Sequence, residues 1–297
     1  MKCKKCSSTS VIKLRQHNVS YCEYHFNEYF EKRVEKTIVK YGMCKPEDRI
    51  LVAVSGGKDS SVLLYVLDKM GYRVDGVFVD TGTVTPPYEE LKQLQDLIRG
   101  QVYYLDIRDY FLGLTIPEVS KILRRPTCSV CGTARRYILN RYALIAGYNV
   151  LAMGHNLDDE CAVLLGNVLN WHIGYLSRQK PVLHKTHPGF VKKIKPLVLL
   201  TEREIYAYAL LNHIPCSKES CPFSKNASSL RYKSGINGVE RYHPGTKLRF
   251  YTEFVKKSPF EPEKVTIKSC SVCGYPTTED ICAFCRMKAR VKNALGK

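Results

Sequence analysis

The hydrophobic residues in the first third of the chain alternate between short continuous runs and helical stripes. Residues 50–54 are a short apolar run that predicts a strand, and residues 74–80 are expected to form the next strand. Between them apolar residues recur at helical spacing, and Gly71 is expected to end that helix. The helical stripe consists of Val62, Leu63, Val66, Leu67 and Met70. This segment therefore predicts a strand–helix–strand unit.

The same alternation continues along the chain. Helices are expected at 88–99, 132–148 and 157–170, and strands at 102–106 and 149–154. Strands that alternate with helices predict an α/β fold, a parallel sheet with helices on both faces.

The hydrophobic pattern is less regular before and after this alternating region. An amphipathic basic helix is expected at 21–42, and a helix at 201–213 stands in an otherwise weak region from 174 to 250. Two prolines within 258–268 predict a linker.

Cysteines at the two ends of the chain have the spacing of metal ligands. Near the N-terminus the pattern is C-x2-C followed by C-x2-H, and near the C-terminus it is C-x2-C twice. Two such pairs complete a tetrahedral shell, which predicts one Zn²⁺ at each end. The expected ligands are Cys3, Cys6, Cys22 and His25, and Cys270, Cys273, Cys282 and Cys285.

The charge balance favours a polyanionic partner. The formal net charge is +18, and several of the 20 tyrosines stand directly beside a basic residue. Cations release counterions from phosphates, and aromatic faces stack on unpaired bases, so RNA is the expected ligand. A basic surface without a specific partner remains the alternative. No apolar run is long enough to span a bilayer and the N-terminus does not read as a secretory signal, so a cytoplasmic protein with no membrane partner is expected.

A glycine loop, SGGKDS, joins the first strand to the helix after it. Its residues are Ser55, Gly56, Gly57, Lys58, Asp59 and Ser60. Backbone amides at such a helix start can cradle an anion, although the loop fits neither G-x4-G-K-[ST] nor G-x-G-x-x-G. The alternative is an ordinary helix-start turn in which Ser55 or Asp59 acts only as a cap.

A second polar stretch, GHNLDD, follows the strand at 149–154. Ligands of parallel sheets bind at the carboxyl ends of strands, so this stretch and SGGKDS are expected to line one site. Asp159 is the candidate for metal or proton handling, while His155, Asn156 and Asp158 could simply cap the helix.

A further C-x2-C pair, Cys128 and Cys131, stands alone in mid-chain. By itself it could be half a zinc site, a redox couple or a disulfide, and a disulfide is disfavoured in a cytosolic chain. The sequence GTARR after the pair is expected to begin the helix at 132–148.

Taken together, SGGKDS and GHNLDD resemble the PP-loop ATP pyrophosphatase superfamily, with its adenine nucleotide alpha hydrolase-like fold. These enzymes cleave ATP between the α- and β-phosphates and adenylate a carbonyl oxygen. The resemblance implies that the loop amides and Lys58 hold the pyrophosphate, that Asp59 holds Mg²⁺ or positions the loop, and that Asp159 is a second metal or proton site.

Within this superfamily the chain resembles the TtuA family of tRNA 2-thiouridine synthetases, which act on the T-loop uridine at tRNA position 54. The resemblance rests on the terminal zinc patterns, the C-terminal CGYPTTEDICAFCR, and Cys128–x2–Cys131 with a distant Cys221–Pro222. It implies that Cys128, Cys131 and Cys221 hold a [4Fe–4S] cluster with one open iron. Cys216 is the alternative third ligand, and a redox cycle with a cysteine persulfide is a rival mechanism.

The resemblance also assigns residues at ATP, namely Ala53, Val79, Arg135 and Gly154, together with the loop 55–60. Position 135 departs from bacterial members known to carry lysine there. Arginine can clamp phosphate bidentately but cannot act as a base, so phosphate binding is the expected role. A position on a basic RNA-facing helix is the alternative.

The function implied is ATP-dependent thiolation of tRNA. The 2-oxygen of uridine would be adenylated and then replaced by sulfur, with a ubiquitin-like thiocarboxylate protein as sulfur carrier and a homodimer as the assembly. The alternatives are a wobble-uridine thiolase or another PP-loop tRNA-modifying ligase, and a non-catalytic zinc-ribbon RNA-binding protein. The expected domains are an N-terminal zinc finger (1–30), a catalytic domain (31–257) and a C-terminal zinc ribbon (258–297).

Overall fold

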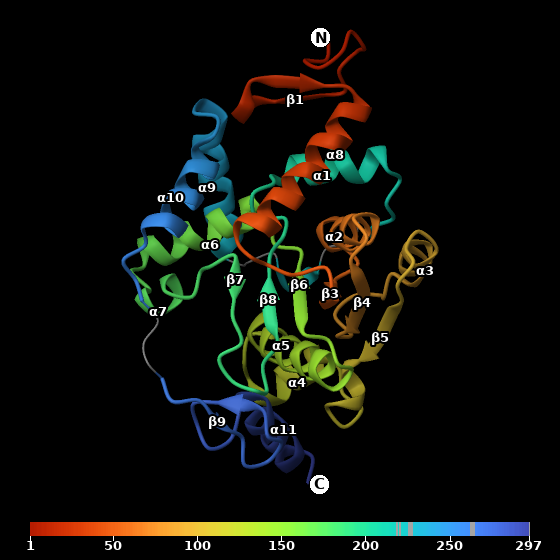
Figure 1. Cartoon of the computed structure of the whole chain (residues 1–297). Coiled ribbons are helices and arrows are strands. Elements are labelled where there is room, and N and C mark those ends of the chain that lie inside the picture. The colour runs from red at the N-terminus through yellow and green to blue at the C-terminus, as the bar shows by residue number, and fades with distance from the viewer. Residues whose placement is uncertain (218, 220, 225–227, 262–264, 297) are drawn as a thin grey trace.

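A six-stranded sheet in the order β5-β4-β3-β6-β8-β7 forms the centre of the computed structural model (Figure 1). The first five strands in that order are parallel, and β7 pairs antiparallel with β8 at one edge. The strands are β3 (Arg49–Val54), β4 (Arg73–Asp80), β5 (Val102–Asp106), β6 (Val150–Met153), β7 (Val182–Leu183) and β8 (Lys192–Ile194). The predicted parallel sheet is confirmed.

The structure describes residues 1–217, 219, 221–224, 228–261 and 265–296. The linker predicted at 258–268 therefore includes three residues, 262–264, that lie outside the described part.

Helices cover both faces of the sheet. The β3 residues Ile50, Val52 and Val54 face one core, whereas Leu51 faces the other, as the alternation of side chains along a strand requires. The helices of the first core include α1 (Glu23–Lys40), α2 (Lys58–Lys69), α3 (Tyr88–Asp96), α6 (Leu157–Leu169), α8 (Glu202–Leu211), α9 (Ser228–Tyr242) and α10 (Thr246–Lys257). Those of the second include α4 (Ile116–Leu123), α5 (Thr127–Ile145) and α11 (Ala283–Ala294).

Small hairpins lie at opposite ends of the molecule (Figure 1). The N-terminal hairpin pairs β1 (Ile12–Leu14) with β2 (Val19–Tyr21), and the C-terminal one pairs β9 (Lys268–Ser269) with β10 (Pro276–Thr277). The Phe284 ring stacks on Tyr137 of α5, with 3.9 Å between the ring centroids. The C-terminal unit is thereby fixed to the second core.

The structure corrects the predicted start of one helix. The cysteine pair was expected to precede the helix at 132–148, but α5 begins at Thr127 and includes both cysteines. The reason is that a C-x2-C spacing of three residues also matches one turn of α-helix, and Pro126 ends the preceding segment without interrupting the new helix. The strands β7 and β8, the short helix α7 (Ile173–Leu176) and the helices α9 and α10 fill the region that lacked a clear pattern.

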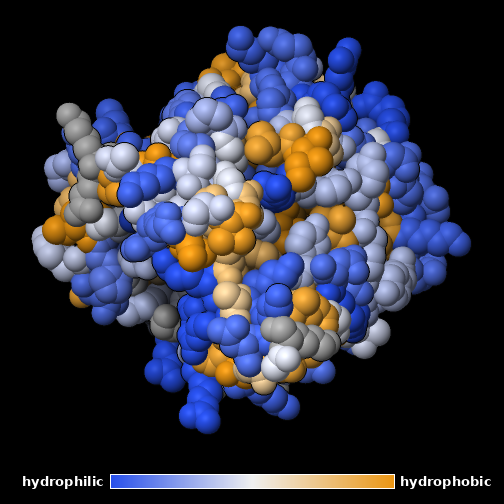
Figure 2. All heavy atoms as spheres, turned by 90° about the horizontal axis from the view of Figure 1, so that it is seen from below, coloured by the Kyte–Doolittle hydropathy of each residue, from blue (hydrophilic) through white to orange (hydrophobic). Residues whose placement is uncertain are grey.

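The surface agrees with the charged composition. Seen from the end that carries the C-terminus, hydrophilic residues cover most of the molecule and hydrophobic side chains form separate small patches (Figure 2). Among the described helices, none combines the length and the hydropathy needed to cross a bilayer.

Candidate active site and cysteine clusters

The two polar stretches lie at the carboxyl ends of adjacent strands. β3 pairs with β6, and the chain leaves β3 towards β4 on one side and β6 towards β8 on the other. This reversal of strand order is where parallel sheets bind their ligands. The loop at 55–57 leads into α2, and Asn156 leads into α6. The structure thus brings SGGKDS and GHNLDD together.

Ser60 holds the glycine loop in shape. Its hydroxyl accepts a hydrogen bond from the Ser55 N–H and donates one to the Gly57 carbonyl, both at 3.0 Å. Gly56 has a φ of 81°, and a Cβ there would lie 2.6 Å from Pro87 Cγ. No side chain caps the start of α2, which leaves the first amides of the helix available to an anion.

Gly154 allows the end of β6 to approach the start of α2. A Cβ on Gly154 would lie 2.9 Å from the Ser60 nitrogen and 3.0 Å from the Asp59 carbonyl carbon. Both are backbone atoms, which cannot rotate away. Close packing between the strand end and the glycine loop therefore requires glycine at this position.

The Gly154→Ala substitution is expected to displace the loop, with a loss of about 1–3 kcal/mol in the free energy of unfolding. Chemical denaturation measures the effect. Gly235→Ala is the matched control, because Gly235 lies in α9 with nothing within 4 Å of an added Cβ. If Gly154→Ala and Gly235→Ala behave alike, the close approach does not require glycine.

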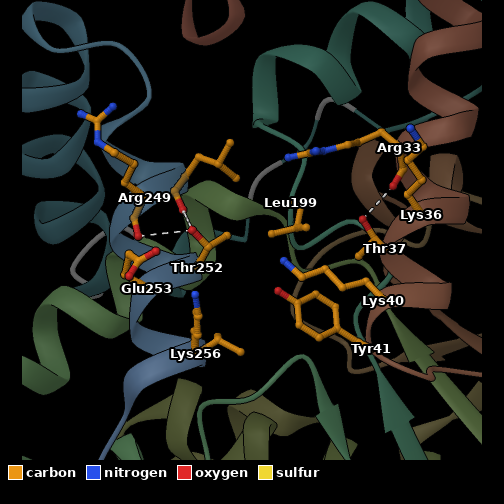
Figure 3. A pocket seen from close by; sticks show the side chains of 12 residues that line it. Arg33, Lys36, Thr37, Lys40, Tyr41, Leu199, Arg249, Thr252, Glu253 and Lys256 are labelled. Atoms are coloured by element: carbon orange, nitrogen blue, oxygen red, sulfur yellow. Dashed lines mark hydrogen bonds between the residues drawn. The ribbon is translucent and has the colours of Figure 1, made fainter.

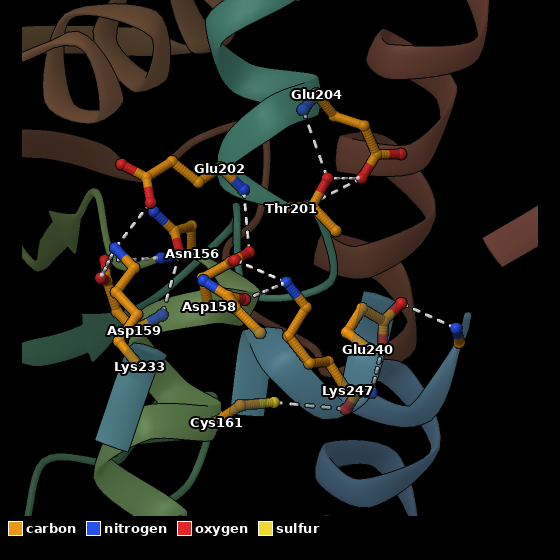
Figure 4. A network of polar contacts seen from close by, with 12 residues as sticks. Asn156, Asp158, Asp159, Cys161, Thr201, Glu202, Glu204, Lys233, Glu240 and Lys247 are labelled. Carbon is orange, nitrogen blue, oxygen red and sulfur yellow. Dashed lines mark hydrogen bonds and ion pairs between the residues drawn. The ribbon is translucent and has the colours of Figure 1, made fainter. Parts of the chain in front are cut away.

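Two lysines and three carboxylates form an ion-pair network above the loop. Lys58 Nζ lies 2.6 Å from Glu202 Oε1 and 3.2 Å from Asp59 Oδ2. Lys233 Nζ lies 2.7 Å from Glu202 Oε2 and 3.0 Å from Asp159 Oδ1 (Figure 4). Glu202 therefore bridges the two lysines, and each lysine also contacts one predicted site aspartate.

The network sets the protonation states of its members. Partial burial alone would raise the pKa of Glu202, but the hydrogen bonds and charges of Lys233 and Lys58 outweigh it and lower that pKa to about 2. Burial raises the pKa of the Asp59 carboxyl, against the opposing effect of Lys58. The pKa of Lys58 is raised because Glu202 and Asp59 outweigh its desolvation. Lys58 is consequently a cation at neutral pH, ready to exchange its carboxylates for phosphate oxygens.

The acidic residues of GHNLDD have different surroundings. Asn156 caps α6, its side-chain oxygen accepting the Asp159 N–H at 3.0 Å. Asp158 is buried, pairs with Lys247 Nζ at 2.6 Å and accepts the Glu202 N–H at 2.9 Å. Asp159 is more exposed and faces Lys233. Asp158 thus holds α6, α8 and α10 together, and Asp159 is the one that faces the site.

The mid-chain cysteines lie in the first turns of α5. The Cys128 thiol donates a hydrogen bond to the Phe223 carbonyl at 3.2 Å, which holds the segment after Cys221 against α5. Burial raises the pKa of the Cys131 thiol. The positive charge of Arg135 lowers that pKa in part, whereas the nearby Cys221 and Cys128 raise it further. Cys131 therefore lies within the electrostatic reach of the other two cysteines and of Arg135. The three sulfur atoms come from two segments and, unlike the ligand atoms of the terminal groups, do not all lie within 4.8 Å of one another. Three cysteines in one region are a donor set that an iron–sulfur cluster can take.

Three more of the predicted site residues, Cys216, Ala53 and Val79, lie around the glycine loop and at the strand ends. Cys216 lines a cavity of about 390 Å³ with Pro87 and Glu90, beside the glycine loop. Ala53 and Val79 lie near the ends of β3 and β4, and the Val79 side chain is buried, so it can offer ATP only its main chain.

The terminal cysteine groups fit Zn²⁺ and lie away from the glycine loop. Within each group of four, the ligand atoms all lie within 4.8 Å of one another. The Cys6–Cys22 and Cys273–Cys282 sulfur pairs are 3.7 Å and 3.8 Å apart, close to the spacing of about 3.8 Å that a tetrahedron with 2.3 Å Zn–S bonds requires.

Comparison with known proteins decides the family. Residues 2–27 match the N-terminal LIM domain of 2-thiouridine synthetase TtuA, residues 48–105 the tRNA methyl transferase HUP domain, and residues 267–286 the four-cysteine zinc finger domain of RecR. The tRNA-5-methyluridine(54) 2-sulfurtransferase of Thermotoga maritima is 46% identical and covers 100% of this chain and 99% of that protein. That of Pyrococcus horikoshii is 43% identical over 96% and 93%. The chain belongs to the tRNA-5-methyluridine(54) 2-sulfurtransferase family.

A solved structure agrees with the fold of this sulfurtransferase. The U34-tRNA thiolase NcsA from Methanococcus maripaludis, solved with its [4Fe–4S] cluster, has a TM-score of 0.81 at 24% identity and covers 97% of this chain and 96% of that one. The predicted family and fold class are confirmed.

Three residues of the site of this sulfurtransferase were missed by the sequence patterns. Glu202, Lys233 and Lys247 come from α8, α9 and α10. One signal was available for Glu202, because Thr201-x-x-Glu204 forms a capping box that places Glu202 in the first turn of α8. Lys233 and Lys247 stand in basic runs that indicated RNA binding and nothing more specific.

Proposed function

We propose that this sulfurtransferase uses ATP to convert the T-loop uridine at tRNA position 54 to 2-thiouridine. One observation carries the proposal. The helix α5, which begins with the cysteines, packs against β4 and β6 and ends at Ile145, shortly before β6 begins at Val150. The start of α5 therefore lies towards the carboxyl ends of these strands, where β6 leads into GHNLDD.

The proposed reaction has two steps, adenylation of the uridine and replacement of the adenylated oxygen by sulfur. The uridine 2-oxygen attacks the α-phosphorus of ATP and pyrophosphate leaves. Sulfur then bonds to C2 and the bond from C2 to the adenylated oxygen breaks, so AMP departs with the former uridine oxygen. The loop amides from Ser55 to Ser60 and Lys58 stabilise charge on the departing pyrophosphate, where it develops. Asp59 and Asp159 supply carboxylate oxygens, the ligands that Mg²⁺ prefers.

We assign the remaining ATP contacts to Ala53, Val79, Gly154 and Arg135. Arg135 is half-buried, always charged, and offers a planar fork of donors that matches a phosphate. It binds the α-phosphate without taking a proton.

Cys128, Cys131 and Cys221 would hold a [4Fe–4S] cluster. When bound by three protein ligands, such a cluster supplies an iron that can accept the sulfur atom. The protein's own contribution is to place these thiols on a helix start and on the segment that the Cys128–Phe223 contact holds against it. A charged Arg135 beside Cys131 favours the thiolate that metal binding needs.

The outer parts of the chain complete the proposal. Two Zn²⁺ ions stabilise the modules at 1–30 and 258–297 around the catalytic domain at 31–257. A ubiquitin-like thiocarboxylate protein delivers sulfur in the cytoplasm, and the enzyme is a homodimer. The uniform spacing of the terminal ligand atoms supports the zinc assignment.

Product analysis tests the function. Wild-type enzyme with reconstituted iron–sulfur cluster, ATP, sulfide and unmodified tRNA should yield AMP, pyrophosphate and one sulfur atom in the T loop by mass spectrometry of nuclease fragments. Sulfur in the anticodon loop would identify a wobble-uridine thiolase instead. Absence of both AMP and sulfur would leave a non-catalytic RNA-binding protein.

A further inference from the structure

A basic groove of about 920 Å³ lies between α1 and α10, outside the site described above (Figure 3). Arg33, Lys36 and Lys40 of α1 line one wall, and Arg249 and Lys256 of α10 line the other. Lys40 and Lys256 extend into the space between the helices, whereas the Arg249 guanidinium turns back to its own helix and donates to the Thr246 hydroxyl at 3.4 Å (Figure 3).

The five cations of this groove lack acidic partners. Within the described residues none of them forms an ion pair. The one acidic side chain in the lining, Glu253, is paired with Lys257 at 2.7 Å. The positive charge of the groove is therefore not neutralised by its own lining, which favours an anionic ligand.

The spacing of the cations suits a chain of phosphates. Arg33, Lys36 and Lys40 recur at i, i+3 and i+7, which keeps them on one helix face over about 10 Å. Arg249 and Lys256 are separated by the same seven residues. Cations spread over this length can pair with consecutive phosphates of one nucleic-acid strand, whereas a single small anion would leave most of them unpaired.

The groove adjoins the candidate active site. Its floor includes Leu199, and Glu202 of the ion-pair network is three residues further on, at most about 11 Å along the chain. A second connection runs through α10. Lys247 directly precedes the lining residue Leu248 and contacts Asp158, which accepts the Glu202 N–H (Figure 4). A strand in the groove would therefore lie close to the reacting centre.

We propose that the groove between α1 and α10 binds the ribose–phosphate backbone of the tRNA substrate, an inference that rests on the proposed function for the identity of the RNA. The five lining cations have no ion-pair partner among the described residues, so the groove favours a polyanion. An RNA strand presents one phosphate for each nucleotide at regular spacing, which the carboxylates of a protein surface do not.

Charge reversal on both walls tests the proposal. In the Lys36→Glu/Lys256→Glu variant, affinity for an unmodified tRNA transcript should fall about tenfold or more at low salt. The slope of log K against log salt should decrease in magnitude by about 1.5, because two phosphate contacts are lost. Filter binding at about 50 and about 200 mM salt measures both quantities. Both lysines are exposed, so thermal unfolding should not change.

Lys92→Glu is the matched control, since Lys92 is an exposed helical lysine of α3 without an ion pair among the described residues. It should bind tRNA within twofold of wild type, and each single reversal, Lys36→Glu or Lys256→Glu, should bind more weakly than Lys92→Glu. Wild-type tRNA affinity and slope in the double variant would overturn the proposal. Unchanged tRNA binding with a loss of carrier-dependent thiolation would assign the groove to a protein. Because binding needs no turnover, the comparison stands even if the wild-type enzyme fails to thiolate tRNA.

Discussion

Replacing Lys58 with Ala is expected to slow AMP formation with tRNA about 10²–10³-fold without unfolding the protein. Lys58 is the cation at the start of α2, where the loop amides gather, and its ammonium would neutralise the charge that develops on pyrophosphate. The fold should survive because Glu202 keeps its 2.7 Å contact with Lys233. Quench-flow or steady-state measurement of AMP, with thermal unfolding in parallel, separates the two effects.

Lys69→Ala provides the matched control for Lys58. Lys69 lies at the other end of the same helix and also forms an ion pair, with Glu31 at 2.7 Å. Its removal should leave AMP formation within about twofold, since exposed ion pairs contribute little to stability. Equal rates for the two variants would mean that Lys58 does not contact the reacting phosphates.

The parts of the site that follow strands could be predicted from the sequence. Short apolar runs followed by SGGKDS and GHNLDD are local signals, and parallel pairing of β3 with β6 necessarily brings the two strand ends together. Gly154 illustrates what remained hidden. The sequence shows a glycine at a strand end. It does not show that a Cβ would clash there, because the clash is with backbone atoms of Ser60 and Asp59, 94 and 95 positions earlier in the chain.

The ion-pair network could not be predicted because its members are distant along the chain. Glu202 is 144 positions from Lys58, and Lys233 is 74 positions from Asp159. Isolated charged residues on helices are common on any surface, so nothing in a local pattern selects these. The predicted start of the helix after the cysteine pair was wrong for a different reason. C-x2-C spacing fits both a zinc knuckle and a helical turn, so the spacing alone does not decide between them. In the structure the pair lies inside α5, which packs against α4 and β6.

Replacing Cys131 with Ala is expected to abolish both cluster binding and tRNA thiolation. Cys131 and Cys221 are half-buried and Cys128 is exposed, and the Cys131 thiol interacts electrostatically with Cys128, Cys221 and Arg135 together. Loss of this ligand leaves two cysteines, too few to keep an iron–sulfur cluster with a single open iron. Iron content after anaerobic reconstitution and sulfur incorporation into tRNA are the measurements, and both should fall to background.

Cys44→Ala separates this effect from a general sensitivity to thiol loss. Burial raises the pKa of Cys44 to about 11, so it remains a thiol at neutral pH, and it packs against the first core at a distance from the trio. Its variant should retain iron and thiolation. Cys131→Ala should still release pyrophosphate from ATP and tRNA in a single turnover, because the glycine loop and Lys58 are intact. Sulfur transfer by an iron-free Cys131→Ala enzyme would contradict the cluster assignment. Loss of transfer with iron fully retained would instead point to a persulfide on Cys131, since the metal would then have other ligands.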